Sequence, residues 1–248
     1  MWRFTADYHT HTKYSHGTGT VEQNVEAAIE RGLKTIGIAD HGPANWPWIG
    51  IRRLANFDRM IADVEAARRK YSEITILSGT EANLISYDGE IDIPEEYIGR
   101  LDQILVGFHT MIIPKRWFEG WRFMCASMAA KKRGERFQQV RKANTQALIA
   151  AVERYPIKII THPGLKIAID SLELAKACAA RGTALEINAR HGVESVGFVI
   201  AAASTGVKFA LSSDAHAPKE VGLLEPAALV ARAADLPVSQ MINVEEDV

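Results

Sequence analysis

The sequence predicts an α/β fold with a parallel sheet, and two observations carry this prediction. Short apolar runs rich in β-branched residues alternate with longer amphipathic stretches through seven rounds, which is the pattern of repeated βαβ units. The 248 residues, of which 47% are hydrophobic, are enough to bury one large core, and single (β/α) barrels have this size. We therefore predict one domain over residues 1–248.

Seven strands are expected in chain order, each as a short apolar run. They cover residues 4–9, 34–39, 74–79, 103–108, 157–161, 184–188 and 208–212. Helical patterns separate them, and the clearest lie at residues 21–32, 52–71, 136–155, 171–182 and 193–206. Three of these patterns end on Gly32, Gly182 and Gly206, where a left-handed residue commonly closes a helix.

One stretch, residues 110–136, is too long for an ordinary connection between a strand and a helix. It carries a mixture of aromatic and basic side chains: Lys115, Arg116, Trp117, Trp121 and Arg122. We interpret it as a packed lid or an oligomer contact, and substrate binding is the second hypothesis, since interfaces also favour Trp and Arg. Trp46 and Trp48, after the second strand, either line the pocket rim or pack against this lid.

Composition excludes several classes of protein. The 29 basic and 30 acidic side chains create no overall field for a polyanion, so no nucleic acid larger than a nucleotide or short oligonucleotide is expected. Cys125 and Cys178 form no CxxC motif, which argues against a disulfide framework or a thiolate zinc site. No signal peptide and no run of about 18 apolar residues is visible. We predict a cytoplasmic protein without a membrane partner.

Histidines and carboxylates follow six of the seven expected strands. They are His9, His11, His16, Asp40, His41, Glu81, His109, His162, Asp214 and His216. Active sites of (β/α) barrels are built where the carboxyl ends of the strands converge. We therefore expect these side chains, which include seven of the eight histidines, to gather around one centre.

Strand parity supports a common centre. Side chains alternate between the two faces of a strand, so Asp7, His9 and His11 share one face of the first strand. Asp214 and His216 have the same two-residue spacing. Two strand ends therefore each present a pair of ligand-type groups to one point.

Taken singly, His41 or His109 is more often a hydrogen-bonded residue than a metal ligand, and Asp40 suits a turn or a residue that orients a ligand. As a set, these side chains would be crowded and poorly solvated unless cations were bound among them. Imidazole with carboxylate and without thiolate suits Zn²⁺, Mn²⁺ or Fe²⁺. Nine ligands predict two or three ions, and clustered ions suit phosphoryl chemistry.

Six motifs, HTHTKYSH, IADHG, GTE, GFHT, THPG and SSDAH, resemble the successive motifs of the PHP (polymerase and histidinol phosphatase) domain. They occur in family order between residues 7 and 216, so the resemblance covers nearly the whole chain. The chain is similar to the stand-alone, single-domain bacterial PHP phosphoesterases. This resemblance implies a distorted (β/α)7, TIM-like barrel with a trinuclear metal centre.

The resemblance also divides the ligands among three divalent transition-metal ions. One ion would be held by His9, His11, Glu81 and Asp214; a second by Glu81, His109 and His162; and a third by His16, His41 and His216. Glu81 would then bridge the first two ions.

The leading hypothesis for function is a metal-dependent phosphomonoesterase that acts on a small phosphorylated metabolite or nucleotide. Hydroxide activated by the ions, which Glu81 and Asp214 help to hold, would attack phosphorus, and His191 or a water would protonate the leaving alcohol. Arg190 would bind phosphate, although a surface pair with a glutamate explains it nearly as well. Glu186 and Asn188 lie within the sixth strand and are interpreted as structural.

Two rival hypotheses stay open at this point. An amidohydrolase-like enzyme would keep the metals but cleave C–N or C–O bonds, although barrel hydrolases of that kind commonly have a different order of later ligands. A regulatory metal-binding module, as in PHP domains attached to polymerases, is disfavoured because no polymerase segment is visible. The expected partner is a small phosphate ester, and a homo-oligomer is possible.

Overall fold

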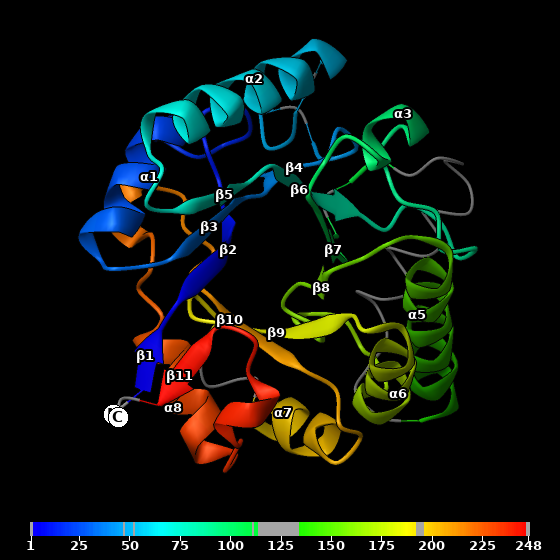
Figure 1. The fold of residues 1–248 in the computed structure, drawn as a ribbon. Helices are drawn as coiled ribbons and strands as arrows, with labels where there is room; N and C mark the ends of the chain where they lie inside the picture. The colour runs from blue at the N-terminus through cyan, green and yellow to red at the C-terminus, as the bar shows by residue number, and fades with distance from the viewer. Residues whose placement is uncertain are drawn as a thin grey trace.

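The computed structural model describes residues 2–46, 48–51, 53–110, 112–113, 134–191 and 196–246. Parallel strands lie at the centre and helices lie on the outside (Figure 1). The predicted α/β class is therefore confirmed. The predicted excursion at residues 110–136, with its Trp, Lys and Arg side chains, lies almost wholly outside the described residues.

Two parallel sheets form the centre of the fold. The larger has the order β10-β9-β8-β7-β6-β4, with strands β4 (Asp40–His41), β6 (Gly79–Asn83), β7 (Gln103–Gly107), β8 (Ile159–Ile160), β9 (Ala184–Asn188) and β10 (Phe209–Ser212). The smaller has the order β2-β3-β5, with strands β2 (Ala6–Thr10), β3 (Thr35–Ile38) and β5 (Thr75–Leu77). All pairings within these two sheets are parallel.

The chain passes directly from the small sheet to the large one at two places. Only Ala39 separates β3 from β4, and only Ser78 separates β5 from β6. On the other side, a parallel bridge joins Thr10 at the end of β2 to Ala215 just after β10. The carboxyl ends of strands from both sheets therefore lie close together.

The predicted third strand differs from the observed one in a way that matters for the site. It is split at Ser78, and β6 continues to Asn83, so Glu81 lies in the middle of a strand instead of after its end. The reason is that β6 is an interior strand, in which Glu81 pairs with His41 on one side and Leu105 on the other. Glu81 is therefore held by strand backbone on both sides.

Seven helices surround the strands in the described part of the chain. They are α1 (Val21–Glu30), α2 (Leu54–Lys70), α3 (Glu95–Ile98), α5 (Glu135–Arg154), α6 (Ser171–Arg181), α7 (Val196–Ala203) and α8 (Glu225–Ala233). The five predicted helices are confirmed, whereas α3 and α8 were not predicted. Local chemistry sets two of the helix ends: Thr20 and Gln23 form a capping box at the start of α1, and Gly182 closes α6 with φ 71°.

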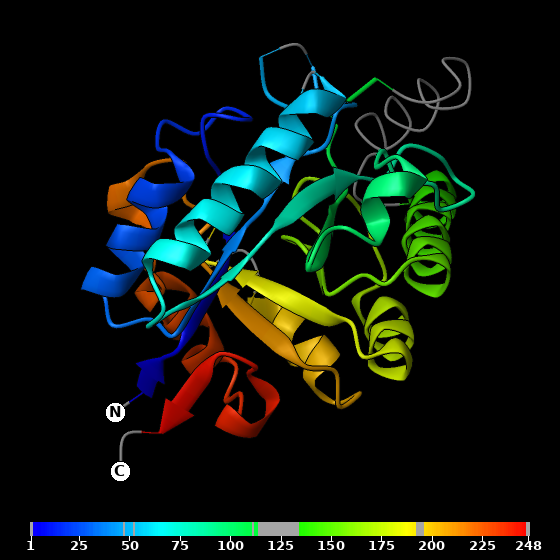
Figure 2. The same cartoon turned by 45° about the horizontal axis from the view of Figure 1, so that its top comes forward.

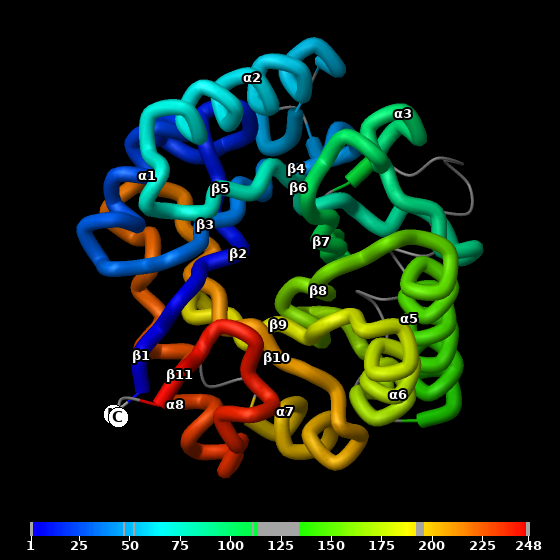
Figure 3. The backbone as a smooth tube through the Cα atoms, in the orientation of Figure 1, coloured from blue at the N-terminus to red at the C-terminus, as the bar shows by residue number. Residues whose placement is uncertain are grey.

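A short antiparallel pair lies apart from the parallel sheets. Strand β1 (Trp2–Phe4) pairs with β11 (Val244–Glu246), the last strand of the chain. Figure 2 and the tube in Figure 3 show these blue and red segments side by side. Neither this pairing nor β11 was predicted from the sequence.

Apolar side chains fill both faces of the parallel sheets. One large cluster lies between the strands and the helices and includes Phe57, Met60 and Val64 of α2, which are fully buried. A smaller cluster joins five other strand or strand-flanking residues: Ala39, Leu105, Ile159, Ala184 and Ala210. Sheets buried on both faces produce the nearly continuous apolar runs seen in the sequence. Among the described residues, no helix is both long and apolar enough to cross a membrane.

Candidate metal centre

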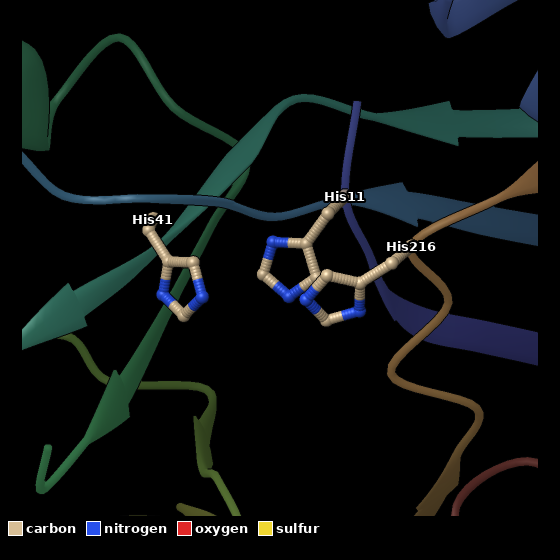
Figure 4. Close-up of side chains that lie close together, drawn as sticks. All are labelled: His11, His41 and His216. Carbon is tan, nitrogen blue, oxygen red and sulfur yellow. The ribbon is translucent and has the colours of Figure 1, made fainter. Parts of the chain in front are cut away.

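All nine predicted metal ligands lie in one region, at the carboxyl-terminal side of the parallel strands. Groups of them that could hold an ion include His11 with His41 and His216, and Figure 4 shows these three rings directed toward one region from different segments. Most of the nine are buried, but His16 is exposed. The centre is therefore closed on its strand side and open to solvent beside His16.

Four of the ligands form a compact cage. The Nε2 atoms of His9 and His11 lie 3.0 Å apart. His9 Nε2 lies 3.4 Å from Glu81 Oε2 and 3.7 Å from Asp214 Oδ1, and His11 Nε2 lies 3.8 Å and 3.2 Å from the same two atoms. Ligands about 2.0–2.1 Å from a tetrahedral zinc ion lie about 3.3 Å from one another. These separations therefore suit four ligands of one ion.

The two carboxylate oxygens of Glu81 face different histidines. Oε2 lies toward His9, His11 and His41, with His41 Nδ1 at 2.8 Å. Oε1 lies 2.9 Å from His162 Nε2 and 3.3 Å from His109 Nε2. Glu81 thus connects the cage to the rings of a second pair of histidines.

The remaining predicted ligands cluster on the open side. The ring centroid of His16 lies 4.2 Å from that of His216 and 4.9 Å from that of His41. The His11 ring lies beside all three. His41 therefore stands between this group and Glu81, so the structure links the two parts of the centre through it.

Three histidines use one ring nitrogen to fix the direction of the other. His9 Nδ1 lies 2.7 Å from Glu186 Oε1, and His109 Nδ1 lies 2.7 Å from Asn83 Oδ1. His216 Nδ1 lies 2.8 Å from the carbonyl oxygen of Asp214. When Nδ1 donates to an oxygen, the Nε2 lone pair is left for a metal, which is the usual arrangement of histidine ligands.

Glu186 connects two strands behind the cage. Besides its contact with His9, its Oε2 accepts hydrogen bonds from the His162 backbone N–H at 2.6 Å and from the Asn188 side chain at 3.0 Å. Asn188 also donates to Asp214 Oδ2 at 3.2 Å. The structural interpretation of Glu186 and Asn188 was therefore incomplete, because both residues orient predicted ligands.

Asp40 has the orienting role that the sequence analysis favoured. Its carboxylate accepts hydrogen bonds from Thr12 through both the backbone N–H (2.7 Å) and the hydroxyl (2.6 Å), and also from Ser15. These contacts fix the loop that ends at His16. Asp40 therefore positions a predicted ligand without pointing at the centre itself.

Backbone geometry at the centre is unusual at two ligands and one glycine. His162 (φ 29°) and Asp214 (φ 53°) have positive φ, which is uncommon for residues other than glycine and tends to occur at functional sites. A Cβ on Gly107 would lie 2.3 Å from the His109 ring and 2.9 Å from Glu81. The glycine of the GFHT motif is thus required by the close approach of these two side chains.

Burial and charge compete at the centre and shift several pKa values. Burial lowers the pKa of His9, but Glu186, Glu81 and Asp214 outweigh it, so that pKa is raised well above its ordinary value. Burial raises the pKa values of Glu81 and Asp214, but the surrounding histidines have a larger opposite effect and hold both pKa values below their ordinary range. These carboxylates are therefore ionised, and cations, either protons on imidazole or metal ions, must balance them.

The pKa values of three histidines shift in the other direction: those of His16 and His41 on the open side and that of His11 in the cage. Burial, together with His41 and His216, lowers the pKa of His16 to about 4. Burial likewise lowers the pKa values of His11 and His41. Neutral imidazole is the form that binds metals, so these rings are prepared for coordination at neutral pH.

Unsatisfied atoms provide an independent test of whether a metal fits. Within the described chain, four buried atoms at the centre lack a well-directed hydrogen bond: His11 Nδ1, His41 Nδ1, Glu81 Oε2 and His109 Nε2. His41 Nδ1 and Glu81 Oε2 lie 2.8 Å apart, but not in the geometry of a hydrogen bond. Buried polar atoms are normally paired, and each exception requires an explanation. Three of the four come from one group that could hold an ion, His41, Glu81 and His109. The donor set and these unpaired atoms both fit divalent metal ions.

Arg190 and His191 lie at the edge of the centre. Arg190 Nη1 lies 3.1 Å from His216 Nδ1, 3.2 Å from the Asp214 carbonyl oxygen and 3.3 Å from Glu220 Oε2. His191 Nε2 lies 3.7 Å from Asp214 Oδ2, and its side chain is 35% exposed. Arg190 does pair with a glutamate, Glu220, which was one of the two hypotheses for it. This pair lies beside two predicted ligands, Asp214 and His216.

Sequence reasoning missed three residues that support the centre. Asn83 contacts His109, Thr161 donates to Glu81 Oε1 at 2.6 Å, and Glu220 accepts from the His216 backbone N–H at 2.9 Å. Asn83 and Thr161 each lie within two residues of a predicted ligand, so their proximity was the available signal. Glu220 follows His216 by four residues, and nothing in the sequence distinguished it from a surface glutamate.

Fold and site together define a class: a parallel α/β protein whose histidine and carboxylate cluster suits divalent metals. Residues 7–194 match the family model of the PHP domain. The chain therefore belongs to the PHP family, as the six motifs indicated.

Relatives of similar length extend this match. The chain is 30% identical over 257 residues to the probable phosphatase YcdX of Escherichia coli O139:H28, a match that covers 97% of this chain and 90% of that protein. It is 29% identical over 257 residues to a probable phosphatase of Shewanella sp. (strain ANA-3), covering 97% and 88%.

Solved structures share the fold at low identity. A histidinol phosphate phosphatase from Lactococcus lactis, complexed with zinc, L-histidinol and phosphate, has a TM-score of 0.62 at 16% identity and covers 94% of each chain. A structure from Listeria monocytogenes has a TM-score of 0.64 at 19% identity, covering 88% of this chain and 97% of that one. At these identities the likeness concerns the fold alone.

Replacing Glu186 by glutamine is expected to weaken metal binding about 10- to 100-fold, because loss of a residue that orients a histidine ligand typically has this effect. The amide can still accept from His9 but carries no charge. Metal affinity would be measured by competition with a chromogenic chelator, with Glu225→Gln on the exposed face of α8 as the control. Unchanged affinity in Glu186→Gln would show that the His9 contact does not orient a ligand.

Proposed function

We propose that this protein is a metal-dependent phosphoesterase that hydrolyses a small phosphate monoester. The observation that carries the proposal is the position of Glu81, whose two oxygens face separate groups of histidines. One carboxylate between two such groups suits a pair of neighbouring ions, and paired ions are the usual means of stabilising phosphoryl transfer. The relatives named as probable phosphatases support the same class of reaction.

We further propose three ions and a distorted (β/α)7 barrel. The first ion is assigned to His9, His11, Glu81 and Asp214; the second to Glu81, His109 and His162; and the third to His16, His41 and His216. The cage distances support the first set, and the two-sided position of Glu81 supports the second. Zinc in the complex of the Lactococcus lactis enzyme supports a divalent transition metal, and manganese and iron suit the same donors.

Bound divalent ions lower the pKa of a water molecule and offset the charge of the phosphoryl oxygens. The chain itself contributes orientation and two groups at the mouth of the centre. Arg190 reaches the phosphoryl group as a cation that is already held by Glu220. His191 is assigned as the proton donor to the leaving alcohol, since its imidazole is partly exposed and lies beside Asp214.

The experiment that tests the function compares phosphate esters with amides and lactones in the presence of Mn²⁺ or Zn²⁺. We expect turnover of phosphate monoesters and competitive inhibition by inorganic phosphate, because clustered cations attract a tetrahedral oxyanion.

In Arg190→Ala the KM for phosphate esters should rise about 10-fold with metal content unchanged, since a charge-assisted hydrogen bond is lost. Arg100→Ala removes an exposed arginine paired with Asp58 and is the control.

Two outcomes would contradict the proposal. Turnover of an amide or lactone, with no phosphate ester cleaved, would favour the amidohydrolase-like alternative. Metal binding without turnover of any substrate would favour a regulatory module. An unchanged KM in Arg190→Ala would remove only the assigned role of that residue.

A further inference from the structure

The loop that follows β4 carries two exposed tryptophans. We call residues 42–46 and 48–51 the rim loop; within it, Trp46 is 53% exposed and Trp48 is 81% exposed. The rim loop has no charged side chain, and its one polar side chain, Asn45, is buried. Large exposed aromatic side chains that cluster in one place commonly mark a binding surface.

The rim loop has a defined conformation. At its base, the Ile51 N–H donates a hydrogen bond to the His41 carbonyl at 2.9 Å. At its tip, the Ile49 N–H donates to the Trp46 carbonyl at 3.0 Å. A Cβ on Gly50 would lie 2.1 Å from the Gly42 carbonyl, so the two sides of the loop touch. Figure 2 shows this blue segment projecting beyond the N-terminal end of α2. The tryptophans are therefore presented from a fixed turn.

Trp48 adopts a conformation that is costly for its residue type. Its φ is 97°, in the region that side chains other than glycine rarely occupy. Strain of this kind persists where the surrounding structure over-determines it, and it concentrates at functional sites. The rim loop therefore keeps the Trp48 backbone in an unfavourable conformation while the Trp48 side chain is exposed.

The rim loop borders the open side of the metal centre. His41 directly precedes the loop, and the backbone of Ile49, the residue next to Trp48, lies near enough to the His16 side chain to act on its pKa. The N–H of Ile113, whose side chain is 58% exposed, donates to the Ala44 carbonyl at 2.6 Å. An apolar, aromatic rim thus adjoins a part of the centre that solvent reaches.

This inference rests on the proposed function. We propose that Trp46 and Trp48 bind the alcohol part of the substrate by stacking, and that the preferred substrates are phosphate monoesters whose alcohol carries a flat aromatic ring. The described rim has no exposed polar side chain that would hydrogen-bond to the hydroxyls of a bare sugar or polyol. Tryptophan faces, by contrast, bind aromatic rings through dispersion and quadrupole interactions.

The test uses two substrates that differ only in the ring. Adenosine 5′-monophosphate and ribose 5-phosphate both release a primary 5′-hydroxyl, so the reacting bond is the same. We expect kcat/KM to favour the nucleotide, and the ratio of the two values to fall about 10-fold in Trp46→Ala or Trp48→Ala, the size of one lost stacking contact. Trp48→Phe keeps a ring and should retain most of the preference. Ile200→Ala, at an exposed apolar residue of α7, is the control.

A binding measurement separates this inference from the proposed function. Adenosine lacks phosphate, so its affinity measured by calorimetry reports on the rim even if no ester is hydrolysed. Weaker adenosine binding in both alanine variants than in the wild type and Ile200→Ala is the expected result. Equal adenosine affinity in wild type and variants would overturn the inference and leave the phosphoesterase proposal intact.

Sedimentation of the same proteins tests whether the rim loop contacts a second copy of this protein instead of a substrate. If the wild type is an oligomer that both alanine variants dissociate, while the substrate ratio stays constant, the rim is a contact between copies and the inference is wrong. An unchanged sedimentation coefficient together with the altered ratio supports a substrate contact.

Discussion

Removal of bound metal with a chelator should abolish phosphatase activity and lower the melting temperature. One site occupied at 100 times its Kd adds about 2.7 kcal/mol to stability, which corresponds to about 5–10 °C in Tm for a chain of this length. The structural reason is that Glu81 and Asp214 are buried and ionised, so without metal they are balanced only by protons on neighbouring imidazoles. Calorimetry before and after dialysis against EDTA measures the change.

Readdition of Zn²⁺ or Mn²⁺ is the matched control for this prediction, and it should restore both activity and Tm. Elemental analysis of the gently purified protein should find about three ions per chain, as expected from nine ligands that share one bridging carboxylate. A value near one per chain would mean that several assigned ligands only orient others. A Tm that does not respond to EDTA would contradict the assignment of the cluster as a metal centre.

Substitution of Glu81 is expected to have the largest effect of any single change. Glu81→Ala removes the carboxylate shared by two assigned sites, so both ions should bind weakly and the rate should fall about 10³-fold or more. His16→Ala, on the open side of the centre, should chiefly remove the third ion. Metal content and phosphatase rate would be measured together for each variant.

Two further variants make this comparison specific. Glu81→Gln keeps the shape of the side chain and tests the charge alone, while Glu73→Gln changes an exposed glutamate outside the centre and should behave as wild type. Full metal occupancy with normal turnover in Glu81→Ala would disprove the bridge, and the proposed mechanism depends on the bridge.

Much of the centre could be predicted because its ligands come from strand ends, where sequence position and spatial position are linked. Strand parity was enough to place His9 and His11 on one face, and the spacing of Asp214 and His216 repeated the argument. Glu81 lies among the other predicted ligands, but it was wrongly located after the end of a strand, since an interior strand that continues past Ser78 has no sequence signal different from a strand followed by a turn.

The supporting residues were less predictable for a physical reason. Glu186 lies in the middle of β9, and its partners, His9 and the His162 backbone, belong to strands far away in the sequence. A buried glutamate within a strand has the same local pattern whether it pairs with a ligand or with another structural group. Strand β11 was missed because three residues at the end of a chain carry too little periodicity to be distinguished from a coil.

The Ser213 hydroxyl donates a hydrogen bond to Asp7, a residue 206 positions away along the chain. This separation in sequence has a consequence for biosynthesis. His9 and His11 are translated long before Asp214 and His216. A nascent chain therefore contains some of the predicted ligands before the others exist. We therefore expect the cage of His9, His11, Glu81 and Asp214 to form only after residue 214 has been made, and fragments that end before residue 213 to lack it.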